Sequence, residues 1–383
     1  MESAFEAARH VEGVALSSLP KVSLHDHLDG GLRPRTVVEL ATRHGIPLPA
    51  EDPEDLARWV AARADSGSLE GYLQTFDLTV GVMQTAEALT RVAREAVEDL
   101  AADGVIHAEL RWAPEQHLTA GLSPDQAVEA VQAGLDQGVQ KARDEGRSIS
   151  ARQLVSGLRQ SGRVHDMGVL AVRHLGTGVA GFDIAGPERG FPPALFERTF
   201  DYLLENGVPV TIHAGEADGV ASIRSAIVHG HALRLGHGVR IAEDISIEPG
   251  DADHPRETLG VLARWVRDRQ IPLELSPSSN LQTGAIAQWG TQLSRHPFDR
   301  LARHGFTVTV NTDNRLMSAT SLTRECGLLA STFGYGLGDL LRFQLNAARG
   351  AFLSLPERLD LLAAVTAGFG LPATRPTDPR PGG

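Results

Sequence analysis

Short apolar runs separated by amphipathic stretches recur along most of this chain, and their number constrains the fold. Eight runs have the length and composition of strands, and apolar residues at helical spacing fill most of the intervals. The runs cover residues 21–27, 105–112, 151–156, 178–184, 208–213, 234–237, 271–275 and 306–311. Strands joined by helical crossovers pair in parallel through right-handed units. Eight of them, with no G-x-G-x-x-G turn after the first, predict an α/β fold of the (β/α)₈ TIM barrel type rather than an open doubly wound sheet.

The remaining segments indicate how the chain is organised around this barrel. A length of 383 residues fits one large barrel domain. We expect that domain over residues 1–371, with a helical insertion at 50–83, extra C-terminal helices at 322–367 and a disordered tail at 372–383. A helix is also expected at 256–269, directly before the seventh strand. Active sites of such barrels lie at the carboxyl ends of the strands, so functional polar residues should gather there.

Composition narrows the classes of partner and compartment. The net charge is −12 and basic residues form no cluster, so nucleic acid and anionic membranes are poor partners. The N-terminus lacks the features of a signal peptide, and no apolar run approaches the roughly 20 residues that span a bilayer. Cys326 is the only cysteine, which excludes intrachain disulfides and any cysteine-based zinc site. We expect a cytoplasmic protein.

Titratable side chains gather at the carboxyl ends of four predicted strands. They are His25 and His27 (first strand), His213 and Glu216 (fifth), His237 (sixth) and Asp313 (eighth). Taken singly, each is explained as well by a polar strand end or a helix cap. Their common position at one end of the barrel favours a functional site over these separate explanations. Three imidazoles and one carboxylate satisfy the ligand requirement of zinc, which lowers the pKa of a bound water.

The lysine content distinguishes between metal architectures. Lys21 and Lys141 are the only lysines, and neither ends a predicted strand. Binuclear hydrolases on this barrel typically bridge two metals with a carboxylated lysine at the end of the fourth strand. A single metal ion is therefore expected here, and Schiff-base chemistry is excluded on the same ground.

Six motifs occur in one order along the chain: PKVSLHDHLDG, GFDIAG, TIHAGEADG, RLGHGVRI, SPSSNLQTG and NTDN. With them the chain resembles the adenosine deaminase family of the amidohydrolase superfamily, from residue 19 to about residue 371. The resemblance implies one Zn²⁺ per chain and a small-molecule purine nucleoside as substrate. The implied reaction is hydrolytic deamination of adenosine and 2′-deoxyadenosine to inosine and 2′-deoxyinosine, with release of ammonia, in purine salvage.

The resemblance also assigns roles to residues by their place in these motifs. It makes four residues the zinc ligands: His25, His27, His213 and Asp313. It makes Glu216 the proton donor to purine N1, and His237 the group that holds the attacking water and helps to deprotonate it. Attack at C6 builds negative charge in the ring, so an acid at N1 lowers the barrier. Burial beside a purine would raise the pKa of Glu216 and keep it protonated.

The resemblance also implies that four residues contact the nucleoside, one of which, His27, is at the same time a zinc ligand. Asp29 would bind ribose hydroxyls, the backbone N–H of Gly181 would meet purine N3, His27 would pack on the nucleoside, and Asn314 would face N7. The family commonly has aspartate and proline where this chain has Asn314 and Arg315. An asparagine amide donates to N7 without first being protonated.

Alternative substrates and an alternative class stay open at this stage. Another 6-aminopurine is possible: adenine, or an N6-substituted or modified nucleoside or nucleotide. Asp29 argues for a free nucleoside, because a carboxylate repels a 5′-phosphate, although Arg33, Arg240 and Arg315 leave nucleotides open. A catalytically silent nucleoside-binding protein would be expected to lack one of the catalytic or ligand residues, and none is missing.

The insertion carries apolar residues on one helical face: Leu69, Tyr72, Leu73 and Phe76. In the family that the chain resembles, such residues form a lid over the ribose mouth. Ordinary core packing of the insertion explains the pattern equally well. The lid interpretation predicts that these side chains cover the site and exclude water.

Overall fold

The computed structural model describes residues 7–248 and 256–370. Eight parallel strands form two four-stranded sheets. The first sheet contains β3 (Lys21–His27), β4 (Val105–Trp112), β5 (Ser150–Leu158) and β6 (Val179–Ala185) in that order. The second contains β7 (Thr211–Ala214), β8 (Arg234–His237), β11 (Leu273–Leu275) and β12 (Val308–Val310). All eight coincide with or overlap the predicted strands.

Two single parallel bridges join the sheets into a closed ring. One links Phe182 of β6 to Val210 just before β7, and the other links Asp26 of β3 to Asp313 just after β12. At the second bridge, the His27 N–H donates to the Asp313 carbonyl over 2.7 Å, and the Asp313 N–H donates to the His25 carbonyl over 3.0 Å. The predicted (β/α)₈ barrel is therefore confirmed, and one of its two seams lies among the predicted site residues.

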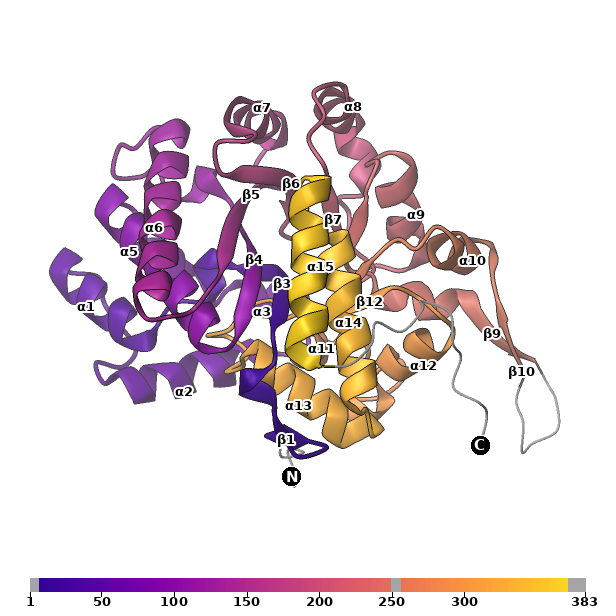
Figure 1. The fold of residues 1–383 in the computed structure, drawn as a ribbon. Coiled ribbons are helices and arrows are strands. Elements are labelled where there is room, and N and C mark those ends of the chain that lie inside the picture. Colours follow the sequence, from indigo (N-terminus) through magenta and orange to yellow (C-terminus); the bar gives the residue numbers. More distant parts are fainter. Residues whose placement is uncertain (1–6, 249–255, 371–383) are drawn as a thin grey trace.

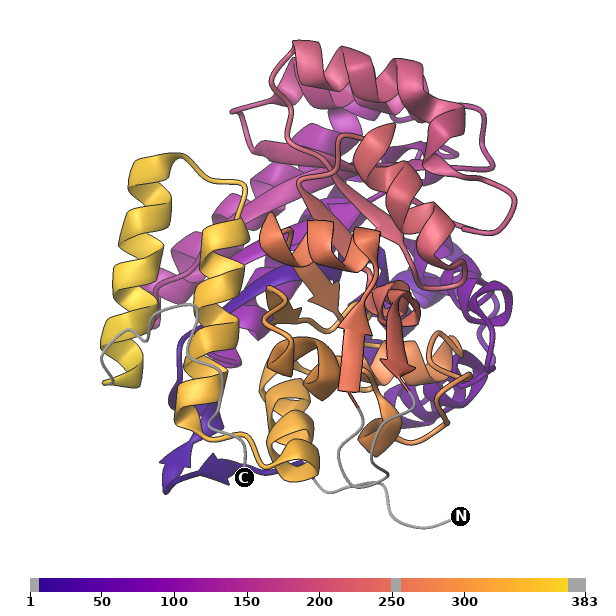
Figure 2. The ribbon, with the colours of Figure 1, turned by 90° about the vertical axis from the view of Figure 1, so that its right-hand side faces the viewer.

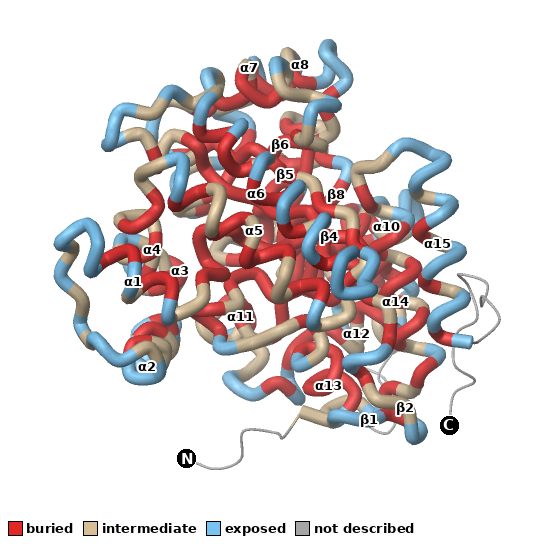
Figure 3. The backbone as a smooth tube through the Cα atoms, turned by 60° about the vertical axis from the view of Figure 1, so that its left-hand side comes forward, coloured by how far each residue is buried: buried red, intermediate tan, exposed pale blue. Residues whose placement is uncertain are grey.

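Helices surround this ring, with the buried chain at the centre and the exposed chain at the periphery (Figures 1 and 3). Between strands lie α1 (Pro34–His44), α5 (Ala86–Ala102), α6 (Pro124–Asp144), α7 (Val164–His174), α8 (Glu197–Glu205), α9 (Val220–Val228), α10 (Val261–Asp268), α11 (Pro277–Gln282) and α12 (Phe298–Arg303). Local signals set several helix ends: Ser123 and Gln126 form a capping box at the start of α6, and left-handed Gly45 ends α1.

The predicted insertion at 50–83 is helical and consists of α2 (Pro53–Ala64), α3 (Leu69–Leu73) and α4 (Phe76–Val82). The C-terminal helices are α13 (Leu322–Phe333), α14 (Leu337–Gly350) and α15 (Leu355–Phe369). The last two lie side by side against the barrel (Figure 2), and α14 contacts β3 and β12. The predicted tail at 372–383 lies outside the described residues.

The helix predicted at 256–269 is wrong over its first part. Arg256–Leu259 is the strand β10, paired antiparallel with β9 (Ile245–Glu248), and only Val261–Asp268 is helical. Asp244 explains the later start, because its carboxylate accepts the Ala263 N–H over 2.8 Å. A β-carbon on Gly260 would come within 2.1 Å of that carboxylate. The N-terminal hairpin of β1 (His10–Val11) and β2 (Val14–Ala15) was not predicted either.

None of the helices within residues 7–248 and 256–370 combines the length and the apolar character needed to cross a membrane.

Candidate active site

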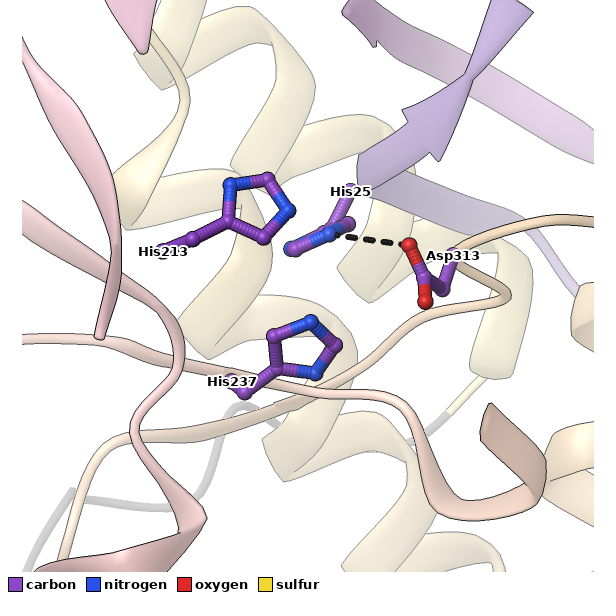
Figure 4. A group of neighbouring side chains, drawn as sticks. All are labelled: His25, His213, His237 and Asp313. Atoms are coloured by element: carbon purple, nitrogen blue, oxygen red, sulfur yellow. Dashed lines mark ion pairs between the residues drawn. The ribbon is translucent and has the colours of Figure 1, made fainter. Parts of the chain in front are cut away.

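The predicted metal ligands come together at the carboxyl end of the barrel. His25, His213, His237 and Asp313 each offer a ligand atom, and these atoms lie within 4.8 Å of one another. Figure 4 shows the three rings around the carboxylate, with the Nε2 of His25 3.2 Å from the Oδ1 of Asp313. The Nε2 of His27 lies 3.2 Å from the Nε2 of His213 and 3.3 Å from the Oδ1 of Asp313. Five candidate ligands therefore surround one point.

Carboxylates behind two of the rings fix where their hydrogens lie. The Nδ1 of His25 is 3.0 Å from the Oε2 of Glu274, and the Nδ1 of His213 is 2.8 Å from the Oδ2 of Asp183. Asp183 is ionised: burial opposes this, but the charges of His213 and Arg111 lower the pKa of its carboxyl. A carboxylate accepts hydrogen bonds, so each ring carries its hydrogen on Nδ1 and turns the Nε2 lone pair to the common point.

This donor set fits a zinc ion. The Nε2 of His25 is buried without a hydrogen-bond partner and lies 3.2 Å from the Oδ1 of Asp313. Converging lone pairs repel one another unless a cation lies between them. Neutral imidazoles with one carboxylate, each imidazole backed by a carboxylate, are the ligands typical of zinc.

Two of these side chains are held in unusual backbone conformations. His237 and Asp313 both have φ of +58°, the left-handed region that non-glycine residues seldom adopt. Such strain occurs preferentially at functional sites, where the surrounding structure over-determines it. The hydroxyl of Ser279, on α11, donates to the Oδ2 of Asp313 over 2.6 Å and orients that carboxylate.

A buried charge network inside the barrel supports the two backing carboxylates. Arg111 donates to Asp183 over 2.9 Å and to Glu274 over 2.7 Å, and Arg234 donates to Glu274 and Glu109 over 2.6 Å each. All five side chains are almost completely buried. Charges buried this deeply persist only when paired. These five residues were not predicted as part of the site, although charged residues within predicted strands were a visible signal.

Glu216 lies beside His237, with 3.5 Å between the Oε2 of Glu216 and the Nε2 of His237. Burial, followed by the charges of Asp313 and Glu188, raises the pKa of Glu216 well above its ordinary value. The raised pKa favours the protonated carboxyl, which is the direction expected for an acid facing a purine. Burial also lowers the pKa of His237 well below its ordinary value, so this ring is neutral.

Glu188, which the sequence did not indicate, holds the loop that carries Glu216. Its carboxylate accepts hydrogen bonds from the backbone N–H groups of residues 215, 216, 217 and 218 at 2.6, 3.1, 2.7 and 2.9 Å. It also accepts the hydroxyl of Ser222 at 2.5 Å. Five donors on one buried carboxylate fix the backbone of Glu216.

A cavity of about 40 Å³ adjoins the metal ligands and Glu216. The four residues predicted to form the lid line it: Leu69, Tyr72, Leu73 and Phe76. The other lining residues are His27, Ala185, Gly186, His213, Glu216, His237, Asp313 and Asn314. The cavity has room for roughly three water molecules, which is less than a nucleoside occupies.

Gly181, predicted to meet purine N3 through its backbone N–H, is not among the residues that line the cavity. A β-carbon on Gly181 would meet Phe352 and the Pro209 carbonyl, away from the cavity, whereas Gly186 lines the cavity after the end of β6. The motif GFDIAG contains both glycines, and the strand runs through the first one. Only the second is at the carboxyl end, where the substrate is expected.

Asp29 does not line the cavity but lies buried close to it. Its carboxylate oxygens are 3.9 Å from the Nδ1 of His27 and 3.9 Å from the Nε2 of His117. The Oδ1 of Asp29 and the Nε2 of His117 are buried without hydrogen-bond partners. The pair thus retains polar atoms that a substrate hydroxyl can satisfy.

Of the three arginines that kept a nucleotide substrate possible, Arg33 and Arg240 are paired with carboxylates, and Arg315 is paired through Nε while its Nη2 is buried without a hydrogen-bond partner. Arg33 pairs with Asp99 and Glu98, Arg240 pairs with Glu243, and the Nε of Arg315 donates to Asp26 over 2.8 Å. None of the three lines the cavity. Their positions favour a substrate without a phosphate.

Comparisons with known proteins agree with this geometry. A family model described as adenosine deaminase matches residues 20–367. Two curated relatives named adenosine deaminase are similar to the chain. That of Mycobacteroides abscessus is 52% identical over 350 residues, covering 91% of this chain and 94% of the relative. That of Mycolicibacterium vanbaalenii is 53% identical over 347 residues, covering 90% and 94%.

Solved structures show the same fold. An adenine deaminase from Arthrobacter aurescens has a TM-score of 0.77 and 26% identity, covering 92% of this chain and 100% of that chain. An amidohydrolase from Burkholderia ambifaria with bound zinc has a TM-score of 0.77 and 27% identity, and the match covers 95% of this chain and 96% of that chain.

Proposed function

The chain belongs to the adenosine deaminase family, and we propose that it hydrolyses adenosine and 2′-deoxyadenosine to inosine and 2′-deoxyinosine, with release of ammonia. The observation that carries this proposal is the pairing of Glu216, a buried carboxyl that stays protonated, with a converging set of metal ligands. An acid and a metal site within one small cavity suit attack on a purine ring that must be protonated as it is attacked.

His25, His27, His213 and Asp313 would hold the zinc ion. When bound, zinc supplies the positive charge that lowers the pKa of a water molecule and makes it a nucleophile. Glu274, Asp183 and Ser279 orient three of these ligands through the contacts described above. The arrangement needs no lysine and would hold one ion.

Glu216 supplies the proton that the ring requires. As water oxygen bonds to C6, electrons move to N1, and the carboxyl of Glu216 donates its proton there. The water gives up both of its protons: one returns to the Glu216 carboxylate and the other goes to the amino group, which leaves as ammonia while the C6–oxygen bond becomes the carbonyl of the product. Glu188 keeps Glu216 in place throughout, because it holds the backbone on both sides of that residue.

The walls of the cavity orient the nucleoside. The backbone N–H of Gly186 replaces that of Gly181 as the donor to purine N3, and the Asn314 amide donates to N7. Asp29 accepts from a ribose hydroxyl, and His27 packs against the nucleoside. The lid of α3 and α4 closes the ribose side. The pairing of Arg33 and Arg240 with carboxylates, and the absence of an arginine from the cavity lining, support a free nucleoside rather than a nucleotide.

A panel of purines tests this substrate choice. Adenosine, 2′-deoxyadenosine, adenine, AMP and N6-methyl-AMP are compared by the loss of absorbance at the adenine band. Adenosine and its 2′-deoxy form should have the highest kcat/KM. Preferred turnover of adenine or of either nucleotide would reject the free-nucleoside assignment and leave the deaminase chemistry intact.

Glu216→Gln tests the chemistry itself. The variant should keep the fold and one zinc per chain but lose at least about 10²-fold in kcat. Metal analysis of the parent protein separates the enzyme from a silent binding protein, which would hold less than one zinc and gain no activity when zinc is added. A cytoplasmic location, and the lack of nucleic-acid and membrane partners, remain predictions from the sequence.

A further inference from the structure

A row of buried hydrogen bonds runs from the protein backbone to His237, the histidine that faces Glu216. It comprises the backbone N–H of Phe298, the ring of His296, the amide of Asn280 and the ring of His237. The successive distances are 3.0 Å (Phe298 N to His296 Nδ1), 3.2 Å (His296 Nε2 to Asn280 Oδ1) and 2.9 Å (Asn280 Nδ2 to His237 Nδ1). We refer to these four groups as the His237 relay.

The direction of each hydrogen bond in the His237 relay follows from its first member. A backbone N–H can only donate, so the Nδ1 of His296 must accept. Burial lowers the pKa of His296 to about 3, and the neutral ring then carries its one hydrogen on Nε2. That hydrogen is donated to an oxygen, which identifies the Asn280 atom facing His296 as Oδ1. The amide nitrogen of Asn280 is thereby turned to His237.

The last bond fixes the tautomer of His237. The amide of Asn280 donates to Nδ1, so the neutral ring of His237 carries its hydrogen on Nε2, the nitrogen that faces the cavity and Glu216. His25 and His213 have carboxylates behind their rings and present lone pairs to the same cavity. An amide behind His237 produces the opposite result.

We propose that Asn280 and His296 are positioning residues that hold His237 in the Nε2–H tautomer. The catalytic consequence of this tautomer rests on the proposed deaminase function. In that tautomer His237 donates a hydrogen bond to the attacking water, or to Glu216, and does not accept the proton of the water. A nitrogen that carries hydrogen does not bind metal. The His237 relay therefore also explains why His237, although within reach, is excluded from the ligand set in favour of His27.

A substitution at Asn280 inverts the tautomer with little change of shape. In Asn280→Asp a carboxylate replaces the amide, still accepts from the Nε2–H of His296, and now accepts from His237 as well. The hydrogen of His237 moves to Nδ1. We expect the variant to keep its fold and zinc content, to lose at least about 10²-fold in kcat, and to change much less in KM.

The ring nitrogens report the tautomer directly and independently of turnover. In zinc-loaded protein with ¹⁵N-labelled histidine, the signal that disappears in His237→Gln identifies this ring. Its one-bond N–H coupling should be on Nε2 in the parent and on Nδ1 in Asn280→Asp. If the parent fails to deaminate adenosine, the proposed function fails while this measurement still decides the tautomer.

Two substitutions at His296 provide the matched control. His296→Gln keeps an N–H near the position of Nε2 and should retain most of the parent kcat. His296→Leu removes the donor, frees the Asn280 amide to rotate, and should lower kcat while zinc stays bound. A hydrogen on the Nδ1 of His237 in the parent would overturn the proposal. So would an Asn280→Asp variant with unchanged kcat, or equal losses of kcat in both His296 variants.

Discussion

At the scale of single residues, the role of each histidine in the site depends on the group behind its ring. Glu274 accepts from His25, the carboxylate of Asp183 lies 2.8 Å behind the Nδ1 of His213, and both rings can then turn a lone pair to a metal. Asn280 donates to His237 and leaves a hydrogen for the substrate side. The side chains are chemically identical, so sequence position alone does not separate ligand from hydrogen-bond donor.

Glu188→Gln should reduce activity without removing the proposed acid. A glutamine amide has one oxygen where Glu188 uses two, and its NH₂ group would face backbone donors of residues 215–218. Each charge-assisted hydrogen bond lost costs about 1.5–3 kcal/mol. We expect kcat to fall about 10- to 100-fold and thermal stability to decrease. Exposed Glu205→Gln is the matched control, and equal kcat in the two variants would contradict a positioning role for Glu188.

His296 should make the protein less stable in acid. Its native pKa is about 3, whereas an unfolded histidine titrates near about 6.5. As pH falls below about 6.5, the unfolded chain binds a proton that the native ring does not, so the free energy of unfolding falls. Between about pH 7.5 and 5.5 this single ring accounts for a loss of about 1.4 kcal/mol.

Urea unfolding of the zinc-free protein at both pH values measures this effect. In His296→Gln the loss of unfolding free energy on acidification should be smaller by about 1.4 kcal/mol. Exposed His44→Gln should leave the loss unchanged. An identical pH dependence in the parent and His296→Gln would show that His296 is protonated in the native state.

At the scale of elements, the insertion acts on the site through α3 and α4. The Gly67 N–H donates to the Gln282 carbonyl over 2.8 Å, and the Tyr72 hydroxyl lies 3.4 Å from that of Ser318. Tyr72 and Leu69 are buried over a cavity of only about 40 Å³. The lid interpretation requires this segment to move for substrate entry and to close again.

Truncating the lid side chains should affect both binding and turnover. Leu69→Ala and Tyr72→Ala remove apolar surface over the cavity and admit water, so we expect KM to rise several-fold and kcat to fall. Steady-state kinetics with adenosine measures both, and Leu359→Ala on the exposed face of α15 is the control. Unchanged kcat and KM in both lid variants would assign these residues to ordinary core packing.

At the scale of the whole molecule, the metal site spans a seam of the barrel. A single bridge between Asp26 and Asp313 joins β3 to the chain after β12. The proposed ligands come from β3, β7 and the segment after β12, and thus from both sheets. A bound ion would link the two sheets where few backbone hydrogen bonds do so.

Removing zinc should therefore lower the thermal stability of the entire barrel. A chelator is expected to lower Tm by roughly 5–10 °C, because an ion bound only by the native state stabilises it by mass action. Zinc should restore Tm, and magnesium should not. His213→Gln should lose the zinc-dependent part of Tm, and His237→Gln should keep it. The reverse order would make His237 the ligand and reject the tautomer assigned to it.

Local patterns in the sequence were sufficient to predict the barrel and the candidate ligands. Alternation of strand-like and helical runs gave β3, β4 and β8 with the bounds found in the structure. Because parallel strands share one carboxyl edge, residues at independent strand ends were expected to meet, and His25, His27, His213 and Asp313 do meet. These predictions succeed since periodicity and strand direction are properties of short segments.

Only the tertiary structure decided what depends on contacts between distant segments. The β9–β10 hairpin forms because two separate segments pair and because Asp244 caps the helix that follows. The backbone conformation of Glu216 depends on hydrogen bonds to Glu188. The proposed donor to purine N3, the backbone N–H of Gly186, is placed by the end of β6. The tautomer of His237 depends on Asn280 and His296, which lie 43 and 59 positions further along the chain. A hydrogen goes to whichever ring nitrogen finds an acceptor, and the fold alone brings donors and acceptors together.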